Sequence, residues 1–583
     1  MKHADGLPNS WDVLRVPAPL VIGVSGHRDL RPGDLYDLIN KVQAIFRNLR
    51  ELYPSTPFIL LSALAEGADR LVARVALEPE NRTRLVVPLP MPQPLYETDF
   101  ETAASLEDFR ALLAQADYSF EIPLPNGVSQ DAVAERGPAR DHQYELQGKY
   151  LALQSQILIA LWDGVDSGKT GGTSEVVKFQ TQGLPRGDCD LETPELFPVY
   201  HIVTPRASNP VPAGTPFSLI HIYPPVFGGD LGKAEGYYEQ AFGNADEFNR
   251  LMIQDDPKLA AQAAQSKKDC VGDLDEGQLT AKEALMLGRY GFADALAIRY
   301  QKWWLRAHRW LHVLVFVSYC CFVLSAEIDT LRYQFLGLSV FFLFGALWIY
   351  FPAKHVKLDN KTEDYRALAE GCRVRFFWQL AGIHDSVADH YLGEQRTELD
   401  WIRRGLFGWE VDLQAGWPGS WAEHRQRIEF VLEHWVDNQQ RYFRKAHSVS
   451  HFWARQFGRT VQACVIIAAV LAVVVLFAGF AEVARAWTTK HHEIHAIIVE
   501  ALLAAGAIGH HYSERRAHHE HRKQYGRMLA IFQNAARMLR AHLDSNDLDG
   551  ARLCLHKLGT EALEESGSWV LLHRARPLEL PHP

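Results

Sequence analysis

Four long apolar runs constrain this chain more than any other feature of its sequence. They cover residues 310–326, 333–351, 461–483 and 494–509, and the third contains VIIAAVLAVVVLFAGF. A helix needs roughly 17 to 25 mostly apolar residues to cross a bilayer. The runs therefore predict two membrane-spanning helical hairpins, each closed by a short polar turn. The first and last runs are near the lower limit of length, so a re-entrant or interfacial placement is the alternative for each.

Basic residues flank each hairpin on the side away from its turn, whereas the turns themselves carry few. The flanking residues are Lys302, Arg306, Arg309, Lys354, Lys357 and Lys361 for the first hairpin, and Arg444, Lys445, Arg455, Arg459, Arg515, Arg516, Arg522 and Lys523 for the second. Because cytoplasmic loops carry an excess of Lys and Arg, we expect both turns outside and both chain ends in the cytoplasm. The start of the chain predicts no cleaved secretory signal, and the scattered cysteines suit a reducing compartment.

The two hairpins look like copies of one unit. An Arg-Tyr pair precedes each hairpin, ending at Tyr300 and Tyr442, and a further tyrosine follows each, at Tyr365 and Tyr525. Internal repeats are common in membrane proteins, so we expect a duplicated helix-hairpin-helix unit. The alternative is two unrelated hairpins, since aromatic and basic residues gather at any membrane boundary.

The first third of the chain alternates strand and helix signals. LVIGVSG, FILLSALAEG, RLVVPLP, YSFEIPL and QILIALW are short apolar runs that predict central strands, and LYDLINKVQAIFRNLREL is an amphipathic helix. The fold class we expect is therefore α/β, a Rossmann-like doubly wound parallel sheet, followed by an all-α membrane region with long cytoplasmic helices. A net charge of −10 argues against a nucleic-acid partner.

Three glycine-containing loops, VSGHRD, SALAEGAD and WDGVDSGKTGGTSE, follow predicted strands. Ligands on such sheets bind outside the carboxyl ends of the strands, glycine lets backbone amides approach an anion closely, and a helix N-terminus adds partial positive charge. The loops predict a pocket for the phosphate or ribose of a nucleotide. Its candidate residues are Ser25, Gly26, His27, Arg28, Glu66, Gly67, Asp69, Trp162, Gly168, Lys169, Thr170, Gly171, Gly172, Thr173 and Glu175.

The main candidates have an expected role in ligand binding and a plainer alternative. We expect Arg28, Lys169 and the amides of Gly171 and Gly172 to hold phosphate, and Glu175 to accept a hydrogen bond from a ribose hydroxyl. Trp162 is expected to stack on a base. The alternatives are a surface ion pair of Arg28 with Asp29 or Asp69, a solvated Lys169, a core-packed Trp162, and loops that are ordinary strand-to-helix turns.

These loops, together with the helix ELQGKYLALQSQ before the strand ILIALW, resemble the SLOG superfamily. It includes DNA-processing proteins of the DprA type, LOG phosphoribohydrolases and nucleotide-sensing domains of bacterial conflict systems. SALAEGAD is similar to the DprA-type glycine loop, and GGTSE is similar to the end of the LOG motif, which places Gly172, Thr173 and Glu175 at its positions. The resemblance covers about the first third of the chain and implies a nucleotide-binding domain.

One departure from the LOG pattern affects the expected activity. LOG enzymes have a proline-glycine-glycine run directly after the strand and an upstream arginine that works with the glutamate. Here Trp162 and Asp163 follow the strand, and Arg140 is the nearby arginine. We therefore expect a ligand sensor rather than an enzyme, with no cofactor and no metal. If the chain were an enzyme, Glu175 would be the catalytic residue of an N-glycosidic phosphoribohydrolase.

The membrane half resembles the two-helix SLATT effector modules that accompany such sensors, here present twice. The resemblance implies a homo-oligomeric bacterial inner-membrane protein that meets lipid and a nucleotide-derived small molecule, and whose spans act as an ion channel or disrupt the membrane in antiphage defence. The alternatives are a membrane-tethered LOG-type enzyme and a scaffold with an empty sheet. The expected domains are 1–205 for the SLOG-like domain, 206–283 for an irregular connection, 284–408 and 423–583 for the hairpin units, and 409–422 for a linker.

Two groups of ionisable residues lie in or near the fourth apolar run. Glu500 lies within it, and because an unpaired charge in a bilayer is costly, we expect Glu500 to line a membrane pathway; a neutral or paired carboxyl near the interface is the alternative. A histidine cluster follows the run. It comprises His510, His511, His518, His519 and His521. Its spacing does not match a metal motif, so we expect an interfacial or pH-responsive helix face.

Overall fold

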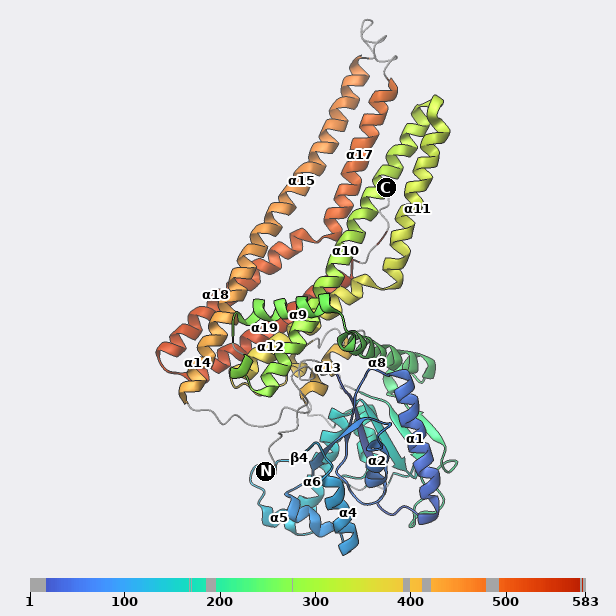
Figure 1. Ribbon diagram of the computed structural model, residues 1–583, viewed down its shortest axis with the longest axis vertical. Coiled ribbons are helices and arrows are strands. Elements are labelled where there is room, and N and C mark those ends of the chain that lie inside the picture. Colours follow the sequence, from blue (N-terminus) through green and yellow to red (C-terminus); the bar gives the residue numbers. More distant parts are fainter. Residues whose placement is uncertain are drawn as a thin grey trace. The chain divides into compact units, whose positions relative to one another are not determined.

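The computed structural model of the chain describes residues 17–576 and 579, except for 167, 169, 185–195, 275, 392–398, 411–420 and 479–491. The chain divides into two compact units. The sheet unit contains Arg15–Asp255 and Thr397–Ala415, and the helical unit contains Asp256–Arg396 and Gly416–Pro583. Figure 1 shows the elements of both units, coloured along the chain.

The sheet unit is built on seven strands in the order β4-β3-β2-β1-β5-β6-β7. All neighbouring strands are parallel except β6 and β7, which are antiparallel. The strands are β1 (Leu20–Gly26), β2 (Phe58–Leu61), β3 (Thr83–Leu89), β4 (Tyr118–Glu121), β5 (Ile157–Trp162), β6 (Val199–Val203) and β7 (Leu219–Ile222). The central strands are nearly continuous apolar runs because helices cover both of their faces. The predicted doubly wound α/β fold is therefore confirmed.

Two separate cores fill the space between the sheet and its helices. α1, α2, α4 and α8 pack on one face, and α6 and α7 pack on the other. Their bounds are α1 (Leu35–Leu52), α2 (Ala68–Ala76), α4 (Ala103–Leu113), α6 (Pro138–Gln154), α7 (Thr173–Gln182) and α8 (Leu231–Ile253). Shorter segments complete the unit, namely α3 (Gln93–Tyr96), α5 (Gln130–Ala134), η1 (Pro32–Asp34), η2 (Glu97–Asp99) and η3 (Pro225–Phe227). The strand order reverses between β1 and β5, which is where open α/β sheets bind ligands.

The irregular connection expected at 206–283 is instead largely regular structure. β7, α8 and α9 (Pro257–Val271) all lie within it. The side chain of Asp230 caps α8 by accepting a hydrogen bond from the Lys233 amide at 3.1 Å. Asp256 caps α9 in the same way, and Pro257 stands at its first position. Aspartate caps and a first-turn proline are start signals for helices, and here they outweigh the polar composition of the segment.

Helix α13 (Asp400–Glu410) belongs to the sheet unit, although we expected residues 284–408 to form one hairpin unit. Its side chains Trp401 and Trp409 are buried. The indole N–H of Trp409 donates to the carbonyl of Pro17 at 3.2 Å, and the Arg404 guanidinium lies 3.5 Å from the ring centroid of Phe197. These partners are far away in the sequence, which is why no local pattern predicted the packing.

Four helices of the helical unit are long and apolar enough to cross a membrane. They are α10 (Ala281–Glu327), α11 (Arg332–His355), α15 (Asn438–Ala478) and α17 (His492–Arg515), and Figure 1 shows α10 beside α11 and α15 beside α17. Large apolar side chains on them face outward, among them Trp348 and Phe477 at 82% and 67% exposure. Such a surface suits contact with lipid. The end of the third predicted span and the turn containing Arg485, Thr489 and Lys490 lie outside the described residues.

The two halves of the helical unit share one arrangement. In each half, the second span ends at a non-glycine residue in the left-handed backbone region, Lys357 with φ 53° and Ala517 with φ 49°. Helices α12 and α18 begin directly afterwards, and Tyr365 and Tyr525 each follow eight residues after the left-handed residue. The ring of Tyr365 lies 5.4 Å from that of Tyr300, and the ring of Tyr525 lies 6.4 Å from that of Tyr442. This matching geometry supports the duplicated unit that the sequence predicts.

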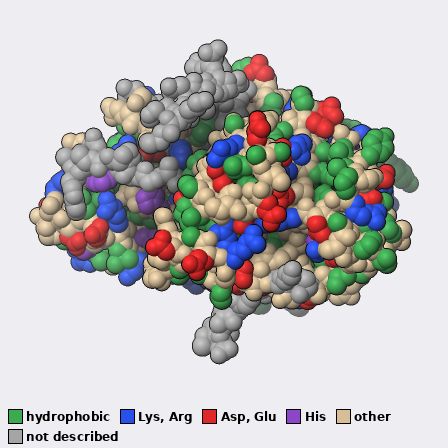
Figure 2. All heavy atoms as spheres, turned by 90° about the horizontal axis from the view of Figure 1, so that it is seen from below, with side chains coloured by type: hydrophobic (Ala, Val, Ile, Leu, Met, Phe, Trp, Pro, Cys, Tyr) green, Lys and Arg blue, Asp and Glu red, His purple; other side chains and the backbone are tan. Residues whose placement is uncertain are grey.

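The remaining helices of this unit pack around the bases of the spans. They are α12 (Leu358–Leu380), α14 (Trp421–Val431), α18 (His518–Asp544) and α19 (Leu548–Arg574), with the single turns η4 (Glu276–Gln278), η5 (Asp329–Leu331) and η6 (Ala388–His390) and the π-helical segment η7 (Leu432–Asp437). On the molecular face shown in Figure 2, Lys and Arg side chains are interspersed with Asp and Glu side chains. That face therefore carries no broad field of one sign.

Candidate functional site

The three predicted loops meet at the carboxyl ends of β1, β2 and β5. The hydroxyl of Ser25, near the end of β1, donates to Oγ1 of Thr173 at the start of α7, at 3.3 Å. Gly67, at the start of α2, has φ 77°, and a Cβ there would lie 2.5 Å from the carbonyl oxygens of His27 and Arg28. A side chain on Gly26 would overlap with Ala68. The close approach of these loops therefore requires both glycines.

His27 supports the loop that follows β5 through hydrogen bonds. Its Nε2 accepts a hydrogen bond from the backbone N–H of Asp163 at 2.9 Å. Burial lowers the pKa of His27, because a buried imidazole is more stable without its charge. The Asp163 carboxylate in turn accepts from Asn209 at 2.9 Å. His27 thus links the first and third loops as a neutral group.

Among the described residues, Arg28 pairs with Asp99 and not with Asp29 or Asp69, the two partners that we considered as alternatives. Asp29 is instead bound by Arg206 at 3.0 Å. The guanidinium of Arg28 lies 3.7 Å from the carboxylate of Asp99 and 5.6 Å from the ring centroid of Tyr144, with 44% of its side chain exposed. Arg28 is therefore a partly solvated cation at the mouth of the loops.

Asp99 and Tyr144 are two residues that sequence reasoning missed. Asp99 accepts hydrogen bonds from Arg140 at 2.8 Å and from the hydroxyl of Tyr144. Arg140 also donates to the carbonyl of Val133 at 2.8 Å, and only 4% of its side chain is exposed. Arg140 is the arginine that an enzyme of LOG type would need, and it is instead buried and hydrogen-bonded within the protein. Asp99 is the last residue of a single helical turn, and no sequence motif identifies it as a binding residue.

The acidic residues of the second loop are buried or bonded. Glu66 accepts a hydrogen bond from the hydroxyl of Ser105. Asp69 is only 7% exposed, and burial raises its pKa to about 7, although nearby Arg28 opposes the shift. At neutral pH this carboxyl therefore titrates beside the candidate site.

The third loop ends at the N-terminus of α7. The backbone N–H of Gly171 donates to the Glu175 carboxylate at 2.6 Å. Gly171 has φ 71°, and a Cβ there would lie 2.7 Å from the Cβ of Tyr144, so glycine is required. Gly172 is the N-cap residue of α7, and Thr170 is exposed. Because a carboxylate already occupies the anion position of this helix end, a phosphate can use the Gly171 amide only by displacing Glu175.

The other candidates of this loop take different positions. The indole N–H of Trp162 donates to the carbonyl of Val165 at 3.1 Å, and its ring lies 5.2 Å from that of His201. Trp162 thus packs with the core on the α6 and α7 face, in line with the core-packing alternative. Gly168 has φ 62° and open space around it. Lys169 lies outside the described residues.

No protein-family model and no curated protein matches this chain. The SLOG and SLATT resemblances therefore rest on the quoted motifs alone.

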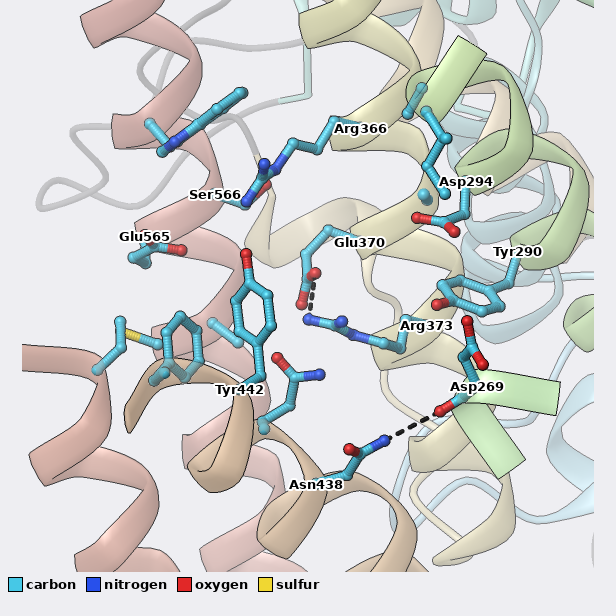
Figure 3. A pocket seen from close by; sticks show the side chains of 18 of the residues that line it. Asp269, Tyr290, Asp294, Arg366, Glu370, Arg373, Asn438, Tyr442, Glu565 and Ser566 are labelled. Carbon is cyan, nitrogen blue, oxygen red and sulfur yellow. Dashed lines mark hydrogen bonds and ion pairs between the residues drawn. The ribbon is translucent and has the colours of Figure 1, made fainter. Parts of the chain in front are cut away.

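A second candidate site is a cavity of about 380 Å³ inside the helical unit. α10 and α12 of the first copy and α15 and α18 of the second contribute to its walls, together with α9 and α19. Figure 3 shows charged side chains that line it, including the ion pair of Arg373 and Glu370, and the hydrogen bond that the Asn438 amide donates to the backbone carbonyl of Asp269. Arg366 lies 4.0 Å from the ring centroid of Trp569. Burial raises the pKa of Glu565 to about 7. A relative movement of the two copies would change the shape of this cavity.

The predicted membrane residues lie on α17. Glu500 is half-buried on this helix. A Cβ on Gly506 would lie 3.5 Å from Val465 and 3.8 Å from Cys464, so small residues bring α17 close to α15. His511 of the histidine cluster lies 3.0 Å from His312 of α10, nitrogen to nitrogen. His511 therefore contacts the other hairpin, whereas His521 lies 3.0 Å from His573 of α19, again nitrogen to nitrogen; the side chains of His518 and His519 are outside the described set.

Proposed function

We propose that this chain is a membrane-anchored sensor of a nucleotide-derived signal, with the sheet unit as receptor and the four apolar helices as effector. The observation that carries the proposal is the meeting of three glycine loops at the β1/β5 switch point, beside partly solvated Arg28 and the N-terminus of α7. That position is where doubly wound sheets bind phosphorylated ligands.

Binding would begin with an exchange at the N-terminus of α7. The ligand phosphate takes the Gly171 amide from Glu175 and pairs with Arg28. The released carboxylate of Glu175 is then free to accept a hydrogen bond from a ribose hydroxyl. The same residue thus reports whether the site is occupied, because its position differs between the two states.

The effector half follows from the membrane helices. Basic flanks place the chain ends and the sheet unit in the cytoplasm, where a nucleotide signal is present. The duplicated hairpins form a homo-oligomeric pathway that opens when the receptor binds its ligand, as a defence against phage. Glu500 lines this pathway, since a carboxylate in a span faces a bundle interior or water.

The receptor is tested by identifying what it binds. The full chain is purified in detergent, and small molecules released on denaturation are identified by mass spectrometry and titrated back by calorimetry. Gly172→Val places a side chain at the α7 N-cap and should weaken binding at least about 10-fold, the equivalent of one charge-assisted hydrogen bond. Gly137→Val is the control, because Gly137 has φ 165° and open space around it.

If the parent and Gly172→Val bind the compound with equal affinity, the loop before α7 does not form part of the binding site. Release of free base from the bound compound would instead favour the phosphoribohydrolase. In liposomes holding the full chain, the identified compound should trigger ion flux, and Glu500→Gln should change its ion preference. Flux that is the same in Glu500→Gln and Glu500→Leu would place Glu500 outside the path.

A further inference from the structure

Three side chains of types that ligate metals converge on one point of the helical unit. Nε2 of His390, in η6, lies 2.7 Å from Oδ2 of Asp385, and Nε2 of His556, on α19, lies 2.7 Å from the same oxygen. The three ligand atoms all lie within 4.8 Å of one another. Two imidazoles and one carboxylate from three different segments therefore face a common centre.

Neighbouring groups fix the orientation of each side chain. The indole of Trp378 stacks on His556 with ring centroids 4.8 Å apart and 15° between the planes. The rings of His390 and His556 stand at 89° to each other. Oδ1 of Asp385 accepts from the Ser386 amide at 3.1 Å, which leaves Oδ2 for the histidines. Such outer contacts are what hold metal ligands in place.

The backbone around Asp385 is held as well. Its carbonyl accepts a hydrogen bond from the buried Arg375 of α12 at 2.8 Å. The Asp385 carboxylate is thus held at its backbone and at Oδ1, and Oδ2 is directed at both imidazoles.

We propose that Asp385, His390 and His556 bind a divalent transition-metal ion of the Zn²⁺ class. Imidazole nitrogen suits Zn²⁺, Fe²⁺ and Ni²⁺, and two histidines with one carboxylate is a ligand set that leaves open positions for water or another ligand. The ion would join the loop after α12, the turn η6 and helix α19. This site is independent of the nucleotide site proposed above.

The ligand atoms must separate slightly to admit the ion. Bonds of about 2.0–2.1 Å in tetrahedral geometry place neighbouring ligand atoms roughly 3.3 Å apart. The present 2.7 Å distances are those of hydrogen bonds between the histidines and Asp385. A shift of about 0.6 Å is therefore needed, and Asp385 and His390 lie in a loop and a single turn that can supply it. Each histidine must also carry its proton on Nδ1, so that Nε2 offers a lone pair.

No local sequence pattern indicates this site, and we expected no metal. Asp385 and His556 are 171 positions apart, so no short motif links them. The histidines that sequence reasoning weighed for a metal are those near the end of the fourth span, and they are different residues.

The test uses the full chain in detergent, treated with EDTA and titrated with Co²⁺ and then Zn²⁺. We expect one tight equivalent of Co²⁺ with the visible absorption of a low-symmetry, four- or five-coordinate ion, displaced by Zn²⁺. His556→Ala and His390→Ala should each weaken this equivalent at least about 100-fold, since loss of even an outer contact commonly costs 10- to 100-fold. Asp385→Asn keeps the shape of the site and should weaken it too.

His542→Ala is the matched control. His542 also pairs with a carboxylate, Asp547, at 2.8 Å, but within the described residues it is in no three-ligand group. The control should keep the tight equivalent. The chain has 26 histidines, so weak binding elsewhere is expected in every variant. A parent without a tight equivalent, or an unchanged tight equivalent in the folded Asp385→Asn variant and both histidine variants, would overturn the site.

Discussion

At the scale of single residues, Asp69 is a buried carboxyl whose pKa of about 7 ties stability to pH. Its unfolded pKa is about 3.9, so between these values the folded state binds more protons than the unfolded state. The free energy of unfolding should therefore fall as pH rises from about 4 to about 7, by at most about 1.4 kcal/mol per pH unit.

Asp69→Asn should remove this part of the pH dependence. The measurement is thermal unfolding of the full chain in detergent between pH 4 and 8. The exposed carboxyl Asp131 offers the control, because Asp131→Asn should leave the slope as it is in the parent. A parent and an Asp69→Asn variant with parallel curves would mean that Asp69 stays ionised in the fold.

At the glycines of the loops, the sequence marks positions where a side chain does not fit, but not what lies there. Gly26, Gly67 and Gly171 were predicted to let backbone amides approach an anion, whereas the atoms that a Cβ would meet at each of them belong to the protein itself. The partners of charged residues were harder to predict. Arg28 meets Asp99, which lies 71 positions away on an unmarked single turn. Which of many carboxylates pairs with a given arginine depends on tertiary packing, and no local pattern contains that information.

At the scale of elements, Gly559 shows how closely α12 and α19 pack. A Cβ on Gly559 would overlap the indole of buried Trp378. Gly559→Ala should therefore destabilise the helical unit by about 1–3 kcal/mol, the usual cost of overpacking. Gly458→Ala should do the opposite, because Gly458 lies inside α15 with open space around it, and alanine favours a helix by about 1 kcal/mol.

The two substitutions form a matched pair for a thermal shift measurement in the same detergent. Both replace a helical glycine with alanine, so their difference isolates the contact with Trp378. Equal shifts would show that α12 and α19 can separate without cost.

Element prediction worked for the central strands and the spans, and it failed for the segment expected to be irregular, which contains β7, α8 and α9. The central strands and the spans stand where their hydrophobic patterns predicted them. Helix α9 was missed because its polar composition hid the Asp256 cap and Pro257. The partners of α13, Pro17 and Phe197, could not be inferred from the sequence of that helix.

At the scale of the whole molecule, the membrane topology is open to direct measurement. The basic flanks predict that Ile328, between α10 and α11, and Thr489, which lies outside the described residues, face the cell exterior. In a background without the seven native cysteines, Ile328→Cys and Thr489→Cys should react with an impermeant thiol reagent on intact cells. Glu80→Cys, exposed in the sheet unit, should react only after the cells are permeabilised. Labelling in the reverse order would place the sheet unit outside and end the sensor proposal.

The return of α13 to the sheet unit means that this unit is not one continuous segment of the sequence. The polypeptide leaves the unit after Asp255, returns at Thr397 and leaves again after Ala415. A fragment that ends at Asp255 would therefore lack α13 and would leave the carbonyl of Pro17 without the indole N–H of Trp409. The sheet unit should for this reason be studied in the full chain, because cutting the chain after the last strand also removes part of the core of this unit.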